Sequence, residues 1–141
     1  MIFIVDTNRI MAGLIRDSIS REILLNPNFE FYTPDFLLTE IKNHKDLIMK
    51  KGDLSERKFN TIYELLIDRI NVLPKSDIMD HIDDAKQIIG DIDRDDVTFI
   101  ALALAIPNNG IWTEDKHFKK QSKIKIWNTK EILDLLNAIS K

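Results

Sequence analysis

Short apolar runs alternate along the chain with longer stretches in which apolar residues recur at helical spacing. The runs predict strands at Ile2–Val5, Phe29–Thr33, Asn71–Leu73, Ile111–Thr113 and Lys125–Trp127. Strands that are separated by helices run parallel, and both faces of a parallel sheet need to be covered. The alternation therefore predicts an α/β protein, a three-layer α/β/α sandwich around a mainly parallel sheet of about five strands.

The length of 141 residues predicts one domain over residues 1–141, because no linker or internal repeat divides the chain. The chain has no cysteine, which excludes a disulfide scaffold, a thiolate zinc site and a cysteine nucleophile. Its longest apolar run, Phe99–Ile106, is far shorter than the roughly 20 residues that cross a bilayer. We expect no membrane partner, no signal peptide and a cytoplasmic protein.

Single residues predict where several helices begin. Pro34 suits the first turn of a helix that continues through Glu40, and Ser55 suits the cap of the next long helix. The stretch Val97–Ile106 is apolar almost all round, which predicts a helix buried against the sheet. Thr129 predicts the cap of a closing helix.

Acidic side chains stand near the points where the predicted strands end. Asp6 directly follows the first strand, and Asp115 comes two residues after the fourth. Asp96 lies in the first turn of the buried helix, and Glu40 lies in the second turn of the helix that leaves the second strand. Because parallel strands end at one edge of a sheet and their crossovers are right-handed, we expect the four acids to converge there.

Taken alone, each acid has an ordinary structural explanation. Asp6 suits a helix cap, and Asp93 with Asp96 suits a capping pair. Glu40 suits a solvated helix face and Asp115 a turn. As a cluster they are costly, because two carboxylates about 4 Å apart repel by about 4 kcal/mol at an effective dielectric of about 20. Oxygen ligands without cysteine favour Mg2+ or Mn2+, and such a site activates water for phosphodiester hydrolysis.

Four segments resemble the motifs of PIN-domain ribonucleases, a family that includes the VapC-type toxins of toxin–antitoxin pairs. The segments are Ile4–Asn8, Leu38–Ile41, Asp95–Ala103 and Trp112–Phe118, and their order and spacing cover nearly the whole chain. The resemblance implies a metal-dependent endoribonuclease that hydrolyses RNA with Mg2+ or Mn2+. It also implies an antitoxin protein as a partner and, because many relatives pair, a homodimer.

The resemblance also implies roles for individual residues. It gives the catalytic and metal-binding roles to four acids, Asp6, Glu40, Asp96 and Asp115. Asn8 and Thr113 match the supporting polar positions of the family. Where much of the family has a further acid, this chain has His117. The shares of Asp93 and Asp95 in the work of Asp96, and the number of metal ions, stay open.

A run of lysines follows the last of these acids. Lys116, Lys119 and Lys120 would place positive charge where an RNA backbone passes, although a lysine-rich surface loop explains them equally well. His117 either contacts a phosphate or leaving group or is an exposed loop histidine. The net charge of -3 argues against RNA binding by bulk positive charge alone. Two alternatives stay open: a non-catalytic PIN-like module that binds RNA or protein, and a housekeeping nuclease that is no toxin.

Overall fold

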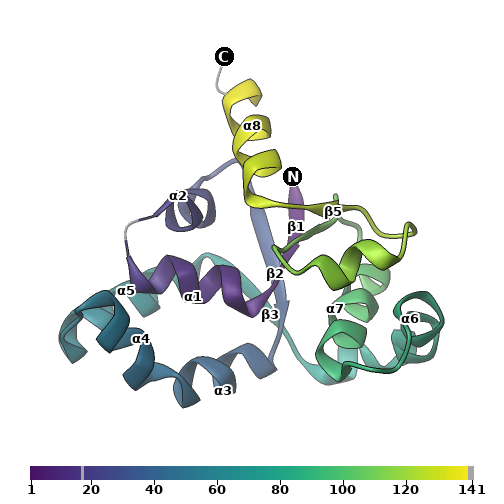
Figure 1. Cartoon of the computed structure of the whole chain (residues 1–141), viewed down its shortest axis with the longest axis horizontal. Coiled ribbons are helices and arrows are strands. Elements are labelled where there is room, and N and C mark those ends of the chain that lie inside the picture. The colour runs from purple at the N-terminus through teal and green to yellow at the C-terminus, as the bar shows by residue number, and fades with distance from the viewer. Residues whose placement is uncertain (17, 140–141) are drawn as a thin grey trace.

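The computed structural model describes residues 1–16 and 18–139, and it contains one five-stranded parallel sheet (Figure 1). The strands are β1 (Ile2–Val5), β2 (Glu30–Pro34), β3 (Ile70–Leu73), β4 (Ile111–Trp112) and β5 (Ile126–Trp127), in the order β3-β2-β1-β4-β5. Ile4 of β1 pairs with Tyr32 of β2 and with Ile111 of β4, so β1 is central. The predicted α/β fold with a parallel sheet is confirmed.

Helices connect the strands and form the two outer layers. They are α1 (Thr7–Ile15), α2 (Ile19–Leu25), α3 (Phe36–Asn43), α4 (Lys45–Gly52), α5 (Glu56–Asp68), α6 (Ile82–Ile89), α7 (Arg94–Ala105) and α8 (Thr129–Ile139). The chain also contains short 3-10 helices, which are η1 (Lys75–Asp77), η2 (Met79–His81) and η3 (Lys116–Lys120). In Figure 1, α6 and α7 lie on one side of the sheet, and α1 to α5 lie on the other.

Successive strand residues enter two separate cores. Phe3 and Val5 of β1 pack among apolar residues of α1, α2, α5 and α8, whereas Ile4 packs with α6 and α7. On β4, Trp112 joins the first core and Ile111 the second. Because neighbouring side chains of a strand point to opposite faces, even a two-residue strand contributes to both layers.

The structure shifts several predicted strand boundaries. The second strand begins at Glu30, one residue later than predicted, and the fourth ends at Trp112. Pro34 is the last residue of β2 and not part of a helical first turn, because it pairs in register with Leu73 of β3. The N–H of Asp35 then donates to the carbonyl of Leu73, at 3.0 Å, which delays the start of α3.

One predicted cap is correct and another is wrong. Ser55 caps α5 by accepting a hydrogen bond from the N–H of Lys58 at 3.1 Å. The closing helix is instead capped by Asn128, which exchanges hydrogen bonds with Glu131 in both directions. Thr129 is the first residue of α8, and its hydroxyl accepts a hydrogen bond from the indole of Trp112.

The strand ends place the acidic residues. Asp6 follows the last residue of β1, and Thr113 follows the last residue of the neighbouring β4. The buried helix α7 begins earlier than predicted, at Arg94, with Asp93 as its cap. In the part of the chain that the structure describes, no helix combines the length and apolar character needed to span a bilayer.

Candidate metal centre

A small acidic pocket lies at the carboxyl edge of the sheet. Its volume is about 150 Å³. The carboxylates that line it are Asp6, Glu40, Asp93, Asp95, Asp96 and Asp115. They come from the end of β1, from α3, from the start of α7 and from the segment after β4. The structure therefore brings together the four acids that were expected to converge and adds Asp93 and Asp95 to them.

Hydrogen bonds to the backbone hold Asp6 in a fixed orientation. Asp6 is the N-cap of α1, and its Oδ1 accepts hydrogen bonds from the N–H groups of Asn8 at 2.7 Å and Arg9 at 3.2 Å. Its Oδ2 accepts a hydrogen bond from the hydroxyl of Thr113. Asp6 is only 6% exposed. Asp6 thus caps a helix and at the same time lies in the pocket as a candidate site residue.

Thr113 connects the acids at the ends of β1 and β4. Its hydroxyl donates to Asp6 and accepts a hydrogen bond from the N–H of Asp115 at 3.0 Å. Asp115 in turn caps η3, because its Oδ1 accepts a hydrogen bond from the N–H of His117 at 2.9 Å. Asn8 lines the pocket and contributes its backbone N–H. Both polar residues that were predicted to support the site therefore contact its acids.

Asp96 is buried beside other negative charges. Asp93 caps α7 and fixes the backbone there, since its Oδ1 accepts hydrogen bonds from the N–H groups of Asp95 and Asp96. Burial raises the pKa of Asp96 to about 6, and the charges of Asp93 and Asp115 act in the same direction, against the opposing effect of His117. A nearby cation would restore the charged form of such a carboxyl group.

Glu40 is a second carboxyl group whose charged form is disfavoured in the pocket. It projects from α3 and is half-buried. Burial and, after it, the charge of Asp95 raise the pKa of Glu40 above its ordinary value, against the opposing effects of His44 and Thr7. The pKa values of Glu40 and Asp96 thus indicate that the pocket is unfavourable for several ionised carboxylates at once.

Two acids of the pocket form a compact group with a histidine that lies beside the pocket. Asp96, Asp115 and His117 each offer a ligand atom, and these atoms all lie within 4.8 Å of one another. Nδ1 of His117 is 3.4 Å from Oδ2 of Asp96. Asp6 and Glu40 line the same pocket but stand outside this group. Sequence reasoning left His117 between two roles, because its approach to Asp96 depends on how η3 folds back from Asp115.

A buried hydroxyl in the pocket also fits a hydrated ion. Thr7 is 5% exposed and lines the pocket, and its Oγ1 makes no hydrogen bond of ordinary geometry among the described residues, although it lies near enough to Glu40 to lower the pKa of that carboxyl group. Buried polar groups usually have a partner, which is often water. Mg2+ and Mn2+ bind carboxylate oxygens and keep several waters, so the donor set and this hydroxyl fit either ion. Thr7 was not predicted from the sequence, where its position next to Asp6 is its one signal.

The lysines that were predicted to bind RNA lie beside the pocket and not in it. Lys116, Lys119 and Lys120 are exposed on η3. Lys120 lines a neighbouring cavity of about 220 Å³ together with Asp96 and His117. Positive charge therefore borders the acidic pocket on the η3 side.

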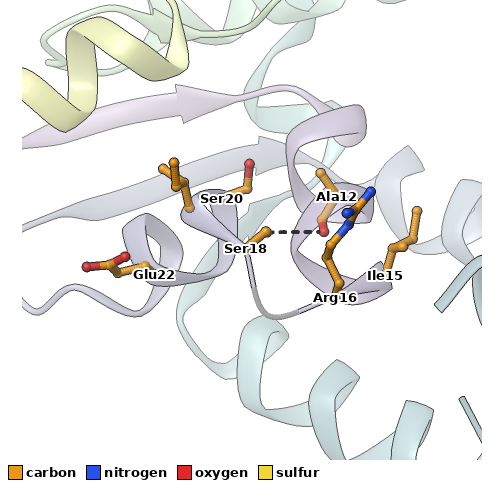
Figure 2. A pocket seen from close by; sticks show the side chains of 7 residues that line it. Ala12, Ile15, Arg16, Ser18, Ser20 and Glu22 are labelled. Atoms are coloured by element: carbon orange, nitrogen blue, oxygen red, sulfur yellow. Dashed lines mark hydrogen bonds between the residues drawn. The ribbon is translucent and has the colours of Figure 1, made fainter. Parts of the chain in front are cut away.

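A larger hollow lies elsewhere, between α1 and α2 (Figure 2). Its volume is about 800 Å³, and its described lining includes Arg16, Ser18 and Glu22. The hydroxyl of Ser18 donates to the carbonyl of Ala12 at 3.4 Å. Glu22 is the one carboxylate among the described lining residues, so this hollow lacks the convergent acids that mark the smaller pocket.

Comparisons with known proteins bear on the family and the fold. A family model described as a PIN domain matches residues 4–137. No curated protein matches the chain. Among solved structures, similarity is found to a chain in the crystal structure of VapBC2 from Rickettsia felis bound to a DNA fragment from their promoter. The TM-score is 0.65 at 17% sequence identity, and the match covers 91% of this chain and 98% of that chain.

Proposed function

The chain belongs to the PIN-domain family, and from this premise we propose that it is a metal-dependent endoribonuclease that hydrolyses RNA phosphodiester bonds. The proposal assigns one nuclease domain to residues 1–141, of which 17, 140 and 141 lie outside the described part. The cofactor is Mg2+ or Mn2+. The place of action is the cytoplasm, where RNA is available to the enzyme.

The observation that carries the proposal is the convergence of carboxylates from four distant segments in one small pocket. A helix cap or a turn explains one acid at a time, but neither explains why mutually repelling groups gather where burial disfavours their charge. A pocket that only bound RNA would gain nothing from this repulsion. A divalent cation compensates it, and phosphodiester hydrolysis is the chemistry that such a cation supports.

In this proposal Asp6, Asp96 and Asp115 hold the metal, and Glu40 holds it or orients the attacking water. A bound divalent ion lowers the pKa of water and stabilises the charge that develops on the phosphate. The chain itself supplies the positioning. Hydrogen bonds from Asn8 and Thr113 fix the carboxylate of Asp6, and the cap of α7 fixes the backbone of Asp96.

We further propose that the enzyme is the toxin of a toxin–antitoxin pair. The support is family membership together with the fold similarity to a chain of the VapBC2 complex. The partner would be an antitoxin protein that masks the acidic pocket, and the expected assembly of the toxin itself is a homodimer. Expression with and without the neighbouring gene product tests this. Toxicity that the neighbour suppresses supports a toxin, whereas harmless expression without a co-purifying partner indicates a housekeeping nuclease.

Cleavage of labelled RNA by the purified protein tests the nuclease proposal. We expect cleavage with Mg2+ or Mn2+, none in EDTA, and a loss of at least about a hundredfold in Asp6→Asn and Asp96→Asn. Asp83→Asn is the matched control, because Asp83 is exposed on α6 and does not line the pocket. Equal cleavage by the wild type and Asp6→Asn would defeat the proposal.

The alternative function, a non-catalytic module that binds RNA or protein, gives a different result. It predicts that the wild type binds RNA but leaves it intact with either metal. It also predicts that neutralising an acid of the pocket improves RNA binding, since a repulsive charge is removed. A nuclease instead cleaves the RNA with either metal, and neutralising an acid of its pocket lowers the rate of cleavage.

A further inference from the structure

A second, mostly apolar cavity adjoins the acidic pocket. Its volume is about 240 Å³, and its apolar wall consists of Phe36, Ile78, Met79 and Ile82. This wall comes from the start of α3, from the η1–η2 segment and from the start of α6. Glu40, Asp95 and Phe36 line both cavities, so a ligand in the apolar cavity lies directly beside the candidate metal centre.

Cations that are free of ion pairs border this cavity. Lys75 of η1 and Arg94 of α7 line it and are exposed. Neither forms an ion pair with another residue of the described chain. The carboxylates of Glu40 and Asp95 face the acidic pocket as well, and Asp35 also lines the cavity. An apolar wall with unpaired cations fits a ligand that is flat and apolar on its faces and attached to phosphate.

We propose that this cavity binds one unstacked nucleobase of the RNA, in the nucleotide next to the bond that is cut. The inference rests on the proposed function, because that function places the scissile phosphate at the acidic pocket. Phe36 provides the aromatic surface, and its ring is supported edge-to-face by Phe99 with centroids 5.5 Å apart. Bases of single-stranded RNA stack on aromatic side chains of this kind with little sequence preference.

The cations Lys75 and Arg94 favour RNA over an apolar side chain of a protein partner as the occupant, although carboxylates also line the cavity. A leucine or phenylalanine would fill the apolar wall but would leave Lys75 and Arg94 without partners. A nucleotide satisfies both parts, since its base contacts the wall and its flanking phosphates lie near the cations. The short distance to the acids follows from the shared lining residues Glu40 and Asp95.

The test uses the full chain with Met79→Glu and, as a matched control, Leu65→Glu. Met79 is 56% exposed at the cavity and Leu65 is 51% exposed on α5, so both variants add the same charge at similarly exposed sites. The probe is a short fluorescein-labelled single-stranded RNA that the wild type cleaves or, if it cleaves none, a mixed-sequence RNA that it binds in Ca2+. Copies of this probe carry one abasic nucleotide at each position in turn. Urea unfolding checks that both variants remain folded.

We expect one abasic position, beside the cleaved bond, to weaken RNA binding by the wild type roughly tenfold. Met79→Glu should weaken binding of the intact RNA by a similar factor and raise KM with kcat unchanged, and it should be insensitive to that abasic position. Leu65→Glu should behave as the wild type. An abasic penalty that is the same in the wild type and Met79→Glu, or no position-specific penalty, would overturn the proposal.

The outcomes separate this inference from the nuclease proposal. Position-dependent binding in Ca2+ without any cleavage in Mg2+ or Mn2+ would support the base site and contradict the nuclease. Cleavage that ignores the abasic position and Met79→Glu would support the nuclease and contradict the base site. If Met79→Glu instead abolishes binding of a co-purified protein partner while RNA binding is unchanged, the cavity is a protein-docking site and the proposal is wrong.

Discussion

Burial and the charges of Asp93 and Asp115 disfavour the charged form of Asp96 in the metal-free protein. Its pKa is about 6 in the folded chain, against an ordinary value of 3.8 that applies when the chain unfolds. The folded state therefore binds the proton more tightly, so stability is lost as the pH rises through this interval. Above pH 6 the penalty approaches its full value, which stays below about 3 kcal/mol because solvent screens part of the charge.

Neutralising Asp96 should therefore stabilise the metal-free protein. We expect Asp96→Asn to raise the free energy of unfolding in EDTA by up to about 3 kcal/mol at pH 8, and by less at pH 5, where the wild-type carboxyl is mostly protonated. Urea unfolding at both pH values measures this. The same variant should lose the stabilisation that Mn2+ gives to the wild type. A variant that is less stable than the wild type at both pH values would show that the carboxylate itself stabilises the fold.

His117 should influence which metal the pocket prefers. A ring nitrogen suits Mn2+ better than Mg2+, which favours oxygen ligands. We expect His117→Asp to lower the ratio of Mn2+ affinity to Mg2+ affinity about tenfold. Pulsed EPR of the Mn2+-loaded wild type should detect coupling to nitrogen that this variant lacks.

His81→Asp is the matched control for this experiment, because His81 lies on η2 and is not part of the group formed by Asp96, Asp115 and His117. It should keep both the metal preference and the nitrogen coupling of the wild type. Nitrogen coupling that persists in His117→Asp would show that another group of the chain supplies the nitrogen ligand.

Gly110 allows β4 to approach β5 closely. Its φ of 132° lies in the region that side chains disfavour, and a Cβ there would come within 2.4 Å of the carbonyl oxygen of Lys125. The carbonyl of Gly110 also accepts a hydrogen bond from the N–H of Ile4. Because β4 has only two residues, this approach sets the position of Thr113 and Asp115 that follow.

Gly110→Ala should therefore destabilise the protein by roughly 3 kcal/mol or more, as measured by urea unfolding. Gly90→Ala is the control, because Gly90 also has a positive φ, of 86°, but a Cβ there meets no atom within 4 Å. Its cost should be limited to the backbone strain, about 1–2 kcal/mol. Equal costs at the two glycines would show that the contact with β5 does not limit the position of β4.

The elements were predictable from local patterns, but their ends depend on distant contacts. Apolar runs identified all five strands of the sheet, yet Pro34 became part of β2 through its pairing with β3. The hydroxyl of Thr129, which was predicted to cap α8, instead accepts a hydrogen bond from the indole of Trp112 on β4. Such partners lie far away in the sequence, so local propensity does not predict them.

In the candidate site, too, some residues were predictable from the sequence and others depend on distant contacts. The acids after β1 and β4 were predictable, because parallel strands end at one edge of the sheet. The hydrogen bond from Thr113 to Asp6 joins residues 107 positions apart, and the family resemblance predicted only that Thr113 supports the site. The approach of His117 to Asp96 follows from the packing of η3, which leaves no pattern in the sequence, and the buried hydroxyl of Thr7 is signalled only by its position next to Asp6.

The net charge of -3 constrains how the protein as a whole could hold RNA. A polyanion is repelled by the overall charge and by the acidic pocket, so the attraction has to come from local cations. Lys116, Lys119 and Lys120 are exposed on η3, directly after Asp115. If these lysines contact phosphates, they should account for much of the salt dependence of binding.

Replacing the three η3 lysines by glutamine tests this. For single-stranded RNA, log affinity falls with log salt by about 0.7 for each phosphate contact, so the triple variant should reduce the slope by about 2. Fluorescence anisotropy in Ca2+ at several salt concentrations measures the slope. The control replaces Lys50, Arg57 and Lys58, which are exposed on α4 and α5 and do not line the acidic pocket. Both variants change the net charge equally, so equal losses of affinity and slope would mean that overall charge, and not the η3 lysines, governs RNA binding.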